Sequence, residues 1–191
     1  MTGMETTTEA QAAERPSLLP TAVIALVALV VAIIFLSSRS WYLTFKTVHV
    51  ISVVVWIGGG LLLTLFGILA ERARDGIQLA AIARMAAFAG ERIFTPAALL
   101  AVASGIAMVL NLHWGFDHFW IIFGLLGFLS TFVIGIGVLA PMAKQANELI
   151  AEKGPQDPEV QVFASKILLI ARADVAVLLL VIVDMVSKPF S

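Results

Sequence analysis

The chain has 191 residues, of which 60% are hydrophobic and 13% charged, whereas soluble domains carry about 25% charged residues. Its 12 basic and 13 acidic residues nearly cancel, so the strongly basic surface of nucleic-acid-binding proteins is excluded. The absence of cysteine excludes disulfides, thiolate metal ligands and a cysteine nucleophile. Because long apolar stretches without charge recur along the chain, the composition predicts an all-α integral membrane protein.

A polar tail and one separate helix are expected at the amino-terminal end. Residues 1–17 are polar and partly acidic, which predicts a disordered tail. Residues 18–36 contain no charge and predict a first transmembrane helix. A cleaved secretory signal would carry basic residues before its apolar run. Acidic residues precede this one, so we expect a retained helix at the periphery of the fold.

Four further spans are expected between residues 41 and 190. Asp75-Gly76 is a turn signal, and the apolar spacing in 77–90 predicts an amphipathic helix or the projecting end of the next span. A polar loop at 113–118 and a break at 154–158 separate the later helices. The order predicts an up-down-up-down bundle, hence five transmembrane helices in all. The four bundle spans cover about 41–70, 93–112, 119–142 and 167–187.

The basic residues predict the orientation in the membrane, because cytoplasmic loops carry an excess of Lys and Arg. One side holds Arg15, Arg72, Arg74, Arg84, Arg92, Lys144, Lys153 and Lys166, and the other holds Arg39, Lys46 and Lys188. We therefore expect a multi-pass cell-membrane protein with its amino terminus in the cytoplasm and its carboxyl terminus outside. Membrane lipids are the expected partners, and nothing in the residues identifies a protein partner or an oligomeric state.

Ionisable side chains within the spans are functional candidates, since charges at that depth usually face a partner or a wet cavity. With a rise of about 1.5 Å per residue, His49 lies roughly 10–12 Å below an outer interface at Trp41. The other polar membrane residues are Lys46, Glu91, Arg92, Arg172, Asp174 and Asp184. For Arg172 and Asp174, the structural alternative to a proton or ion path is an ion pair with Glu91 or Arg92.

His49 is the only histidine inside an apolar run, which makes it a candidate ligand for haem or a metal. Trp56 lies seven residues later on the same helical face and is a candidate wall for a cofactor pocket. Met108 and Met185 are candidates for a second, thioether ligand. For His49, the structural alternative is a hydrogen bond to Asp184, to a serine or to a backbone carbonyl. For Trp56, Met108 and Met185, the alternative is packing against neighbouring helices.

His113 and His118 flank the outer loop with Asp117, a candidate surface metal site whose alternative is a solvated loop. Gly58-Gly59-Gly60 leaves room for a porphyrin or quinone, or permits close helix contact. Close contact is also expected of the glycines in the fourth span, because small residues let membrane helices approach. These are Gly124, Gly127, Gly135 and Gly137.

Lys46, His49 and Trp56, followed by Gly58-Gly59, resemble the first core helix of a superfamily of bacterial membrane proteins. It includes copper-resistance protein D-like domains, HemJ-like protoporphyrinogen oxidases and a family of predicted integral membrane proteins without assigned function. The segments 172–174 and 184–189 resemble the unassigned family most. The resemblance implies a four-helix core over roughly 41–190 and the inner membrane of a bacterium. It also implies haem b at the histidine in the oxidase branch and copper passage in the copper branch.

The chain differs from the oxidase and copper branches in two ways that bear on function. It has no second intramembrane histidine, and it has no Met- or His-rich segment of the kind that handles copper. We therefore expect a haem- or metal-binding redox or accessory protein with His49 in the outer half of the bundle, and haem b before copper. The alternatives are a transporter of a small solute or ion that uses Arg172, Asp174 and Asp184, and a non-catalytic membrane subunit. No residue pattern indicates a reaction, so the sequence leaves open whether the protein is an enzyme and favours a role without catalysis.

Overall fold

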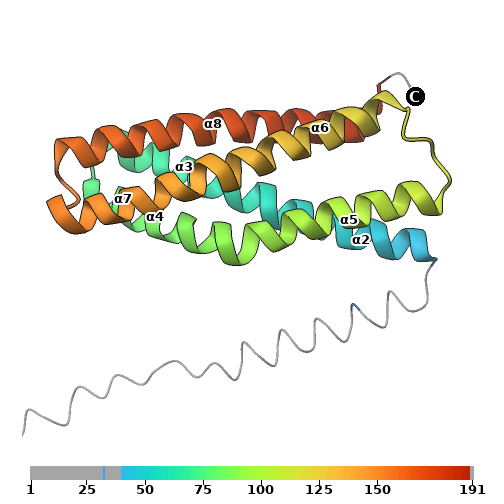
Figure 1. Ribbon diagram of the computed structural model, residues 1–191, viewed down its shortest axis with the longest axis horizontal. Helices are drawn as coiled ribbons and strands as arrows, with labels where there is room; N and C mark the ends of the chain where they lie inside the picture. Colours follow the sequence, from blue (N-terminus) through green and yellow to red (C-terminus); the bar gives the residue numbers. More distant parts are fainter. Residues whose placement is uncertain (1–31, 33–39, 190–191) are drawn as a thin grey trace, which may run out of the picture. The chain divides into compact units, whose positions relative to one another are not determined.

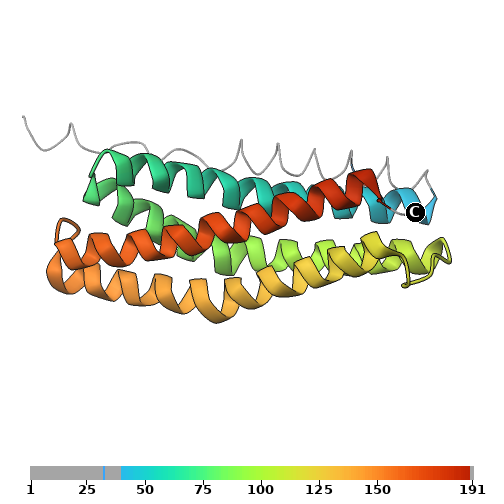
Figure 2. The ribbon, with the colours of Figure 1, turned by 90° about the horizontal axis from the view of Figure 1, so that it is seen from above.

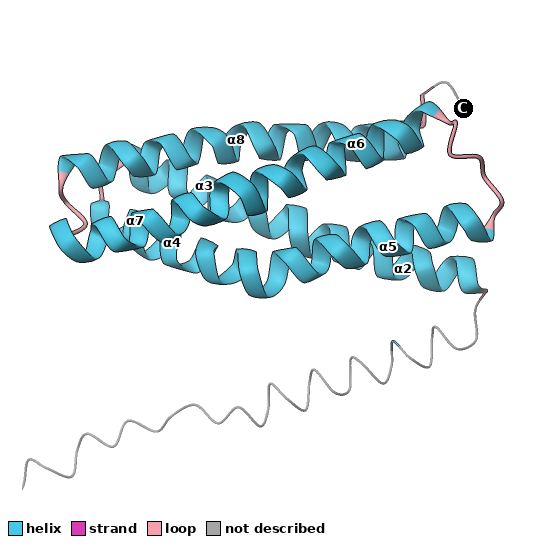
Figure 3. Cartoon of the chain, in the orientation of Figure 1, coloured by secondary structure: helices cyan, strands magenta, loops and turns pink. Residues whose placement is uncertain are grey.

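The structure is a computed structural model that describes Ala32 and residues 40–189. Every regular element within these residues is helical, as Figure 3 shows. The tail expected at 1–17 lies outside the described residues. So does the span expected at 18–36, apart from Ala32.

Four long helices follow one another, and each of the first three contains one π-helical turn. The first rod consists of α2 (Trp41–Val53), η1 (Val54–Gly58) and α3 (Gly59–Arg72). The second consists of α4 (Gly76–Ala89), η2 (Gly90–Phe94) and α5 (Thr95–Asn111). The third consists of α6 (Phe119–Ile134), η3 (Gly135–Leu139) and α7 (Ala140–Lys153). The last is α8 (Pro158–Ser187).

The three rods are long and apolar enough to cross a membrane. The second is one helix of 36 residues, roughly 54 Å long, so the amphipathic stretch at 77–90 is the projecting end of the span that follows it. That length exceeds the ~30 Å hydrocarbon core of a bilayer. By length and composition, α8 is not among the candidates; it carries Arg172, Asp174 and Asp184 within its apolar stretch.

The four helices lie along one another, with the α5–α6 connection at one end and the α7–α8 connection at the other (Figures 1 and 2). Around the α7–α8 connection, α3 packs on α4, α4 on α7, α7 on α8, and α8 on α3. Around the α5–α6 connection, the main contacts are within two pairs, α2 with α5 and α6 with α8. The helices therefore form a closed ring at one end, whereas at the other end the two pairs are joined by a buried cluster of Val109 on α5 with Trp120 and Ile121 on α6.

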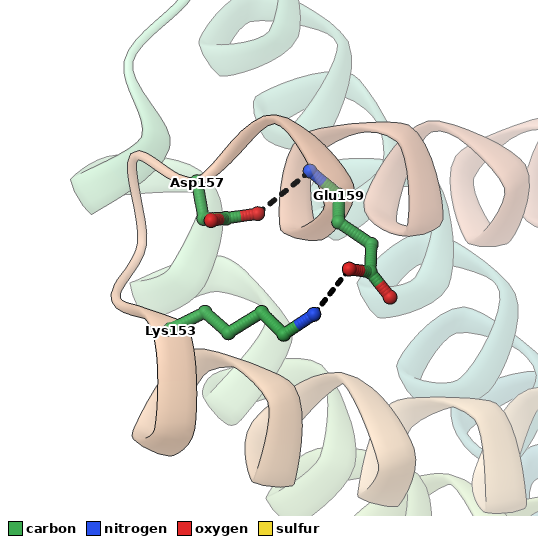
Figure 4. A network of polar contacts seen from close by, with 3 residues as sticks. All are labelled: Lys153, Asp157 and Glu159. Carbon is green, nitrogen blue, oxygen red and sulfur yellow. Dashed lines mark hydrogen bonds and ion pairs between the residues drawn. The ribbon is translucent and has the colours of Figure 1, made fainter.

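Short polar caps fix the connections at the closed end. Asp75 begins α4, and its side chain accepts a hydrogen bond from the Gln78 backbone N–H at 2.9 Å. Asp157 begins α8 in the same way, accepting from the Glu159 N–H at 2.8 Å, while Lys153 donates to the Glu159 carboxylate (Figure 4). These caps satisfy helix-end N–H groups that have no partner inside the helix.

Glycines bring the rods into close contact at some of the expected places. A Cβ on Gly127 would overlap Val181, and one on Gly67 would overlap Leu168, so both residues let α8 approach. Gly124 likewise lies against Met185. Gly135 and Gly137, by contrast, have nothing within 4 Å of an added Cβ, and they lie in the π-helical turn η3. Close approach therefore concerns the α6 glycines and not those of η3.

Replacing Gly67 with leucine should destabilise the fold, because the new side chain would enter the space that Leu168 fills. Overpacking of this kind costs about 1–3 kcal/mol. We expect Gly67→Leu to lower the thermal unfolding midpoint in detergent micelles. Gly60→Leu, on the same helix, is the matched control, since an added Cβ there meets nothing within 4 Å. Equal midpoints for the two variants would contradict the packing described for α3 and α8.

Candidate functional site

A cavity of about 600 Å³ lies between the pair α2–α5 and the pair α6–α8. This volume falls within the range of about 300–1,000 Å³ typical of small-molecule sites. Most of the lining is apolar and much of it is aromatic. The aromatic lining residues are Tyr42, Trp56, Trp114, Phe116, Trp120 and Phe128.

The cavity has a deep end and an end near the α5–α6 connection. Trp56, in η1, meets Phe128 edge to face with ring centroids 5.8 Å apart, and both line the deep end. Tyr42 and Lys46, in the first turns of α2, line the other end together with Trp114 of the loop. With about 1.5 Å of rise per residue from Tyr42 to Trp56, the cavity extends roughly 20 Å along α2 and η1.

His49 lines this cavity, and one nitrogen of its ring is already engaged. Its Nδ1 lies 2.7 Å from the backbone carbonyl oxygen of Ala101. Because a carbonyl can only accept, Nδ1 is the donor in this contact, and in the neutral imidazole the lone pair then lies on Nε2. No described residue forms a hydrogen bond with Nε2. A histidine that ligates a metal through one ring nitrogen usually donates the N–H of its second ring nitrogen to a carbonyl or carboxylate, as Nδ1 of His49 does here.

The imidazole of His49 reaches that carbonyl because Gly105, the neighbouring residue on α5, has no side chain. A Cβ on Gly105 would lie 3.3 Å from both Cε1 and Nδ1 of His49, tighter than an ordinary van der Waals contact. Gly105 therefore gives the imidazole its place against α5. The Ser104 hydroxyl donates to the same Ala101 carbonyl at 3.1 Å. Neither residue stood out in the sequence, where an isolated Ser-Gly pair in an apolar helix carries no specific signal.

The structure brings five of the sequence candidates to this one cavity: Lys46, His49, Trp56, Met108 and Met185. Met108 belongs to α5, in the same helix pair as His49. Met185 belongs to α8, in the opposite pair, and its terminal methyl group fills the space above Gly124. The two thioethers therefore border the cavity from different sides.

Asp184 is not the partner of His49. It is 5% exposed and does not line the cavity, and neither carboxylate oxygen has a hydrogen-bond partner among the described residues. Of the three partner types weighed for His49, the backbone carbonyl is the one that the structure shows. Asp174 also has a buried oxygen, Oδ1, without a described partner.

Arg172 pairs with a residue other than the two expected from the sequence. Its guanidinium donates to the carboxylate of Glu71, at the end of α3. Glu91 and Arg92 instead lie exposed in η2. The ion pair ties α8 to the first rod rather than to the second.

A second cavity, of about 590 Å³, lies at the closed end of the helices. Its polar lining includes Glu71, Arg74, Asp75 and Lys166. It shares no lining residue with the cavity at His49, and neither cavity is lined by Arg172, Asp174 or Asp184.

A model of a family described as "Predicted integral membrane protein (DUF2269)" matches residues 43–189. The chain belongs to the DUF2269 family. The match runs from α2 through the end of α8 and includes every residue of the His49 cavity except Tyr42. Neither a curated protein nor a solved structure matches the chain. The family confirms the predicted class, an integral membrane protein from a family without assigned function.

Membership of DUF2269 explains why large apolar side chains are exposed on the outer surface of the long helices. Leu62, Phe66 and Leu69 on α3 are more than half exposed, as are Leu126 and Leu129 on α6. On a soluble protein, large apolar patches mark interaction surfaces or aggregation sites. On an integral membrane protein they are the surface that meets the lipid chains.

The loop histidines of this DUF2269 protein lie outside the cavity. His118 stacks on Trp120 with ring centroids 6.4 Å apart, while His113 begins the loop with a positive φ of 56°. Among the described residues, no three His, Cys, Asp or Glu side chains form a group that could hold a metal ion. A metal at His113 and His118 stays a prediction.

A double-mutant cycle should detect the ion pair between Glu71 and Arg172. Both side chains are about one third exposed, so we expect a coupling free energy of only about 0.2–1 kcal/mol. The measurement compares unfolding in mixed micelles for Glu71→Gln, Arg172→Gln and the double variant. The same cycle with Glu91→Gln is the control and should be additive. A larger coupling to Glu91 than to Glu71 would contradict the pairing.

Proposed function

We propose that this protein binds haem b in the His49 cavity and serves as a redox or accessory protein of the bacterial inner membrane. The observation that carries the proposal is the state of the His49 ring. Nδ1 is held by the Ala101 carbonyl, which leaves Nε2 as the nitrogen available to an iron atom in the cavity. Neutral imidazole with an oriented ring is the most frequent protein ligand of haem iron.

The residues around His49 fit a large, flat, apolar group. The cavity walls come from both helix pairs, and six aromatic side chains line them. A site of about 600 Å³ is far larger than a single copper ion requires, so the space favours an organic cofactor over a bare metal. Haem b, when bound, supplies a one-electron redox centre.

Other residues around the cavity would orient His49 and enclose the cofactor. The Ala101 carbonyl fixes the ring orientation of His49 and increases its basicity. Trp56 and Phe128, in edge-to-face contact, would form the wall at the deep end of the cofactor site. With haem bound, His49 would hold the iron, and Met185 on α8 or Met108 on α5, which also line the cavity, could supply a thioether donor.

The proposed topology places the α5–α6 connection outside the cell and the α7–α8 connection in the cytoplasm. It is supported by the excess of Lys and Arg in residues 71–92 and 143–166. In this arrangement the four long helices are the up-down-up-down bundle, with residues 18–36 as a fifth span. The shared cavity of Lys46, His49 and Trp56 supports a relation to the haem branch of the proposed superfamily. No specific observation favours a transporter or a non-catalytic subunit.

Removal of His49 should abolish the haem spectrum. We expect the protein, expressed with sufficient haem and purified in detergent, to show a Soret band that His49→Ala loses. His118→Ala is the matched control, because His118 lies outside the cavity, and it should keep the band. Loss of a thioether ligand, tested with Met185→Leu and Met108→Leu, should shift the reduced spectrum.

Two outcomes would contradict the proposal. One is wild-type protein that takes up no haem under these conditions. The other is a Soret band of equal intensity in wild type and His49→Ala. Elemental analysis of the same samples tests whether copper is bound. Copper in place of iron would indicate a copper site formed by His49 and the thioethers of Met108 and Met185.

A further inference from the structure

The entrance of the His49 cavity carries positive charge. Lys46 and Lys188 are the two cationic residues among the described residues that line the cavity, and no acidic residue lines it. Lys46 lies on α2 and is exposed, whereas Lys188 follows α8 and is half-buried. The two lysines therefore reach the cavity from opposite helix pairs.

Aromatic rings hold the two ammonium groups. The Lys188 Nζ lies 4.7 Å from the ring centroid of Trp114 and 4.9 Å from that of Trp120. The Lys46 Nζ lies 5.9 Å from the ring of Tyr42. All three rings line the same cavity. Such cation–π contacts position an ammonium without neutralising its charge.

Neither lysine has an acidic partner in the part of the chain that the structure describes. The ion pairs formed there are Lys153 with Glu159 and Arg172 with Glu71, both away from the cavity. Asp184 lies one turn before Lys188, but its carboxylate oxygens are buried without a partner. The charge at the entrance is thus not balanced by any acidic side chain among the described residues.

The cavity as a whole is amphipathic along its length. Cations and aromatic rings surround the end near the α5–α6 connection, while Trp56, Phe128 and Leu178 form an apolar deep end. A ligand that matches both ends has an apolar body with acidic groups on one edge. A neutral quinone or hydrocarbon would leave the two ammonium groups without an anion.

We propose that Lys46 and Lys188 bind the carboxylates of the cavity ligand and so select a porphyrin dicarboxylate over its neutral derivatives. This inference rests on the proposed function, because it assigns the propionate groups of haem b to the two lysines. It adds an orientation: the carboxylate edge lies at the entrance, and the ring enters toward Trp56.

The test uses metal-free protoporphyrin and its dimethyl ester, which differ only in the two carboxylates. Three of the four tryptophans line the cavity, so quenching of tryptophan fluorescence reports binding in detergent micelles. We expect wild type to bind the diacid at least about ten-fold more tightly than the diester, the scale of a charge-assisted contact. Lys46→Met and Lys188→Met should each weaken diacid binding about ten-fold and leave diester binding unchanged. Lys166→Met, outside this cavity, is the control and should match wild type.

Because the probe has no iron, the role of the lysines is measured separately from ligation by His49. A preference for the diacid that persists in His49→Ala and disappears in the double lysine variant supports the inference even where the Soret experiment fails. Equal binding of diacid and diester by wild type overturns it, as does a preference that the double lysine variant retains. Absence of quenching by either porphyrin also overturns it.

Discussion

The hydrogen bond between His49 and the Ala101 carbonyl joins the first two rods and sets the chemistry of the cavity between the helix pairs. It holds the imidazole against α5, where Gly105 leaves the necessary space. It also fixes the tautomer, because the carbonyl accepts only the Nδ1 proton. The same contact thus stabilises the α2–α5 pair and leaves one nitrogen free within an apolar cavity.

The cavity exists because the four helices pack differently at their two ends. At the closed end α3, α4, α7 and α8 form a ring, whereas at the other end most contacts lie within the pairs α2–α5 and α6–α8, which the cluster of Val109, Trp120 and Ile121 joins. The change occurs near the π-helical turns, which lie roughly 20–26 Å from the α5–α6 end by helical rise. The first three long helices each contain one such turn, and π-helical turns are frequent at functional sites.

The helices and much of the candidate site could be predicted because both depend on local spacing. Apolar runs indicate the long helices, and a separation of seven residues puts His49 and Trp56 on one helical face. The partner of Arg172 could not be predicted, since the choice between Glu71 and Glu91 depends on which rod packs against α8. Lys188 was missed for a related reason: its approach to Trp114 depends on the path of the 112–118 loop.

The state of the His49 ring is open to direct measurement by ¹⁵N NMR of histidine-labelled protein in micelles. The chain has three histidines, so His49→Ala assigns the signal. We expect the Nδ1–H tautomer in the cofactor-free protein and, on addition of haem, a change confined to the His49 signals, largest at Nε2. A proton on Nε2 in the cofactor-free protein, or His49 signals that haem leaves unchanged, would contradict this expectation.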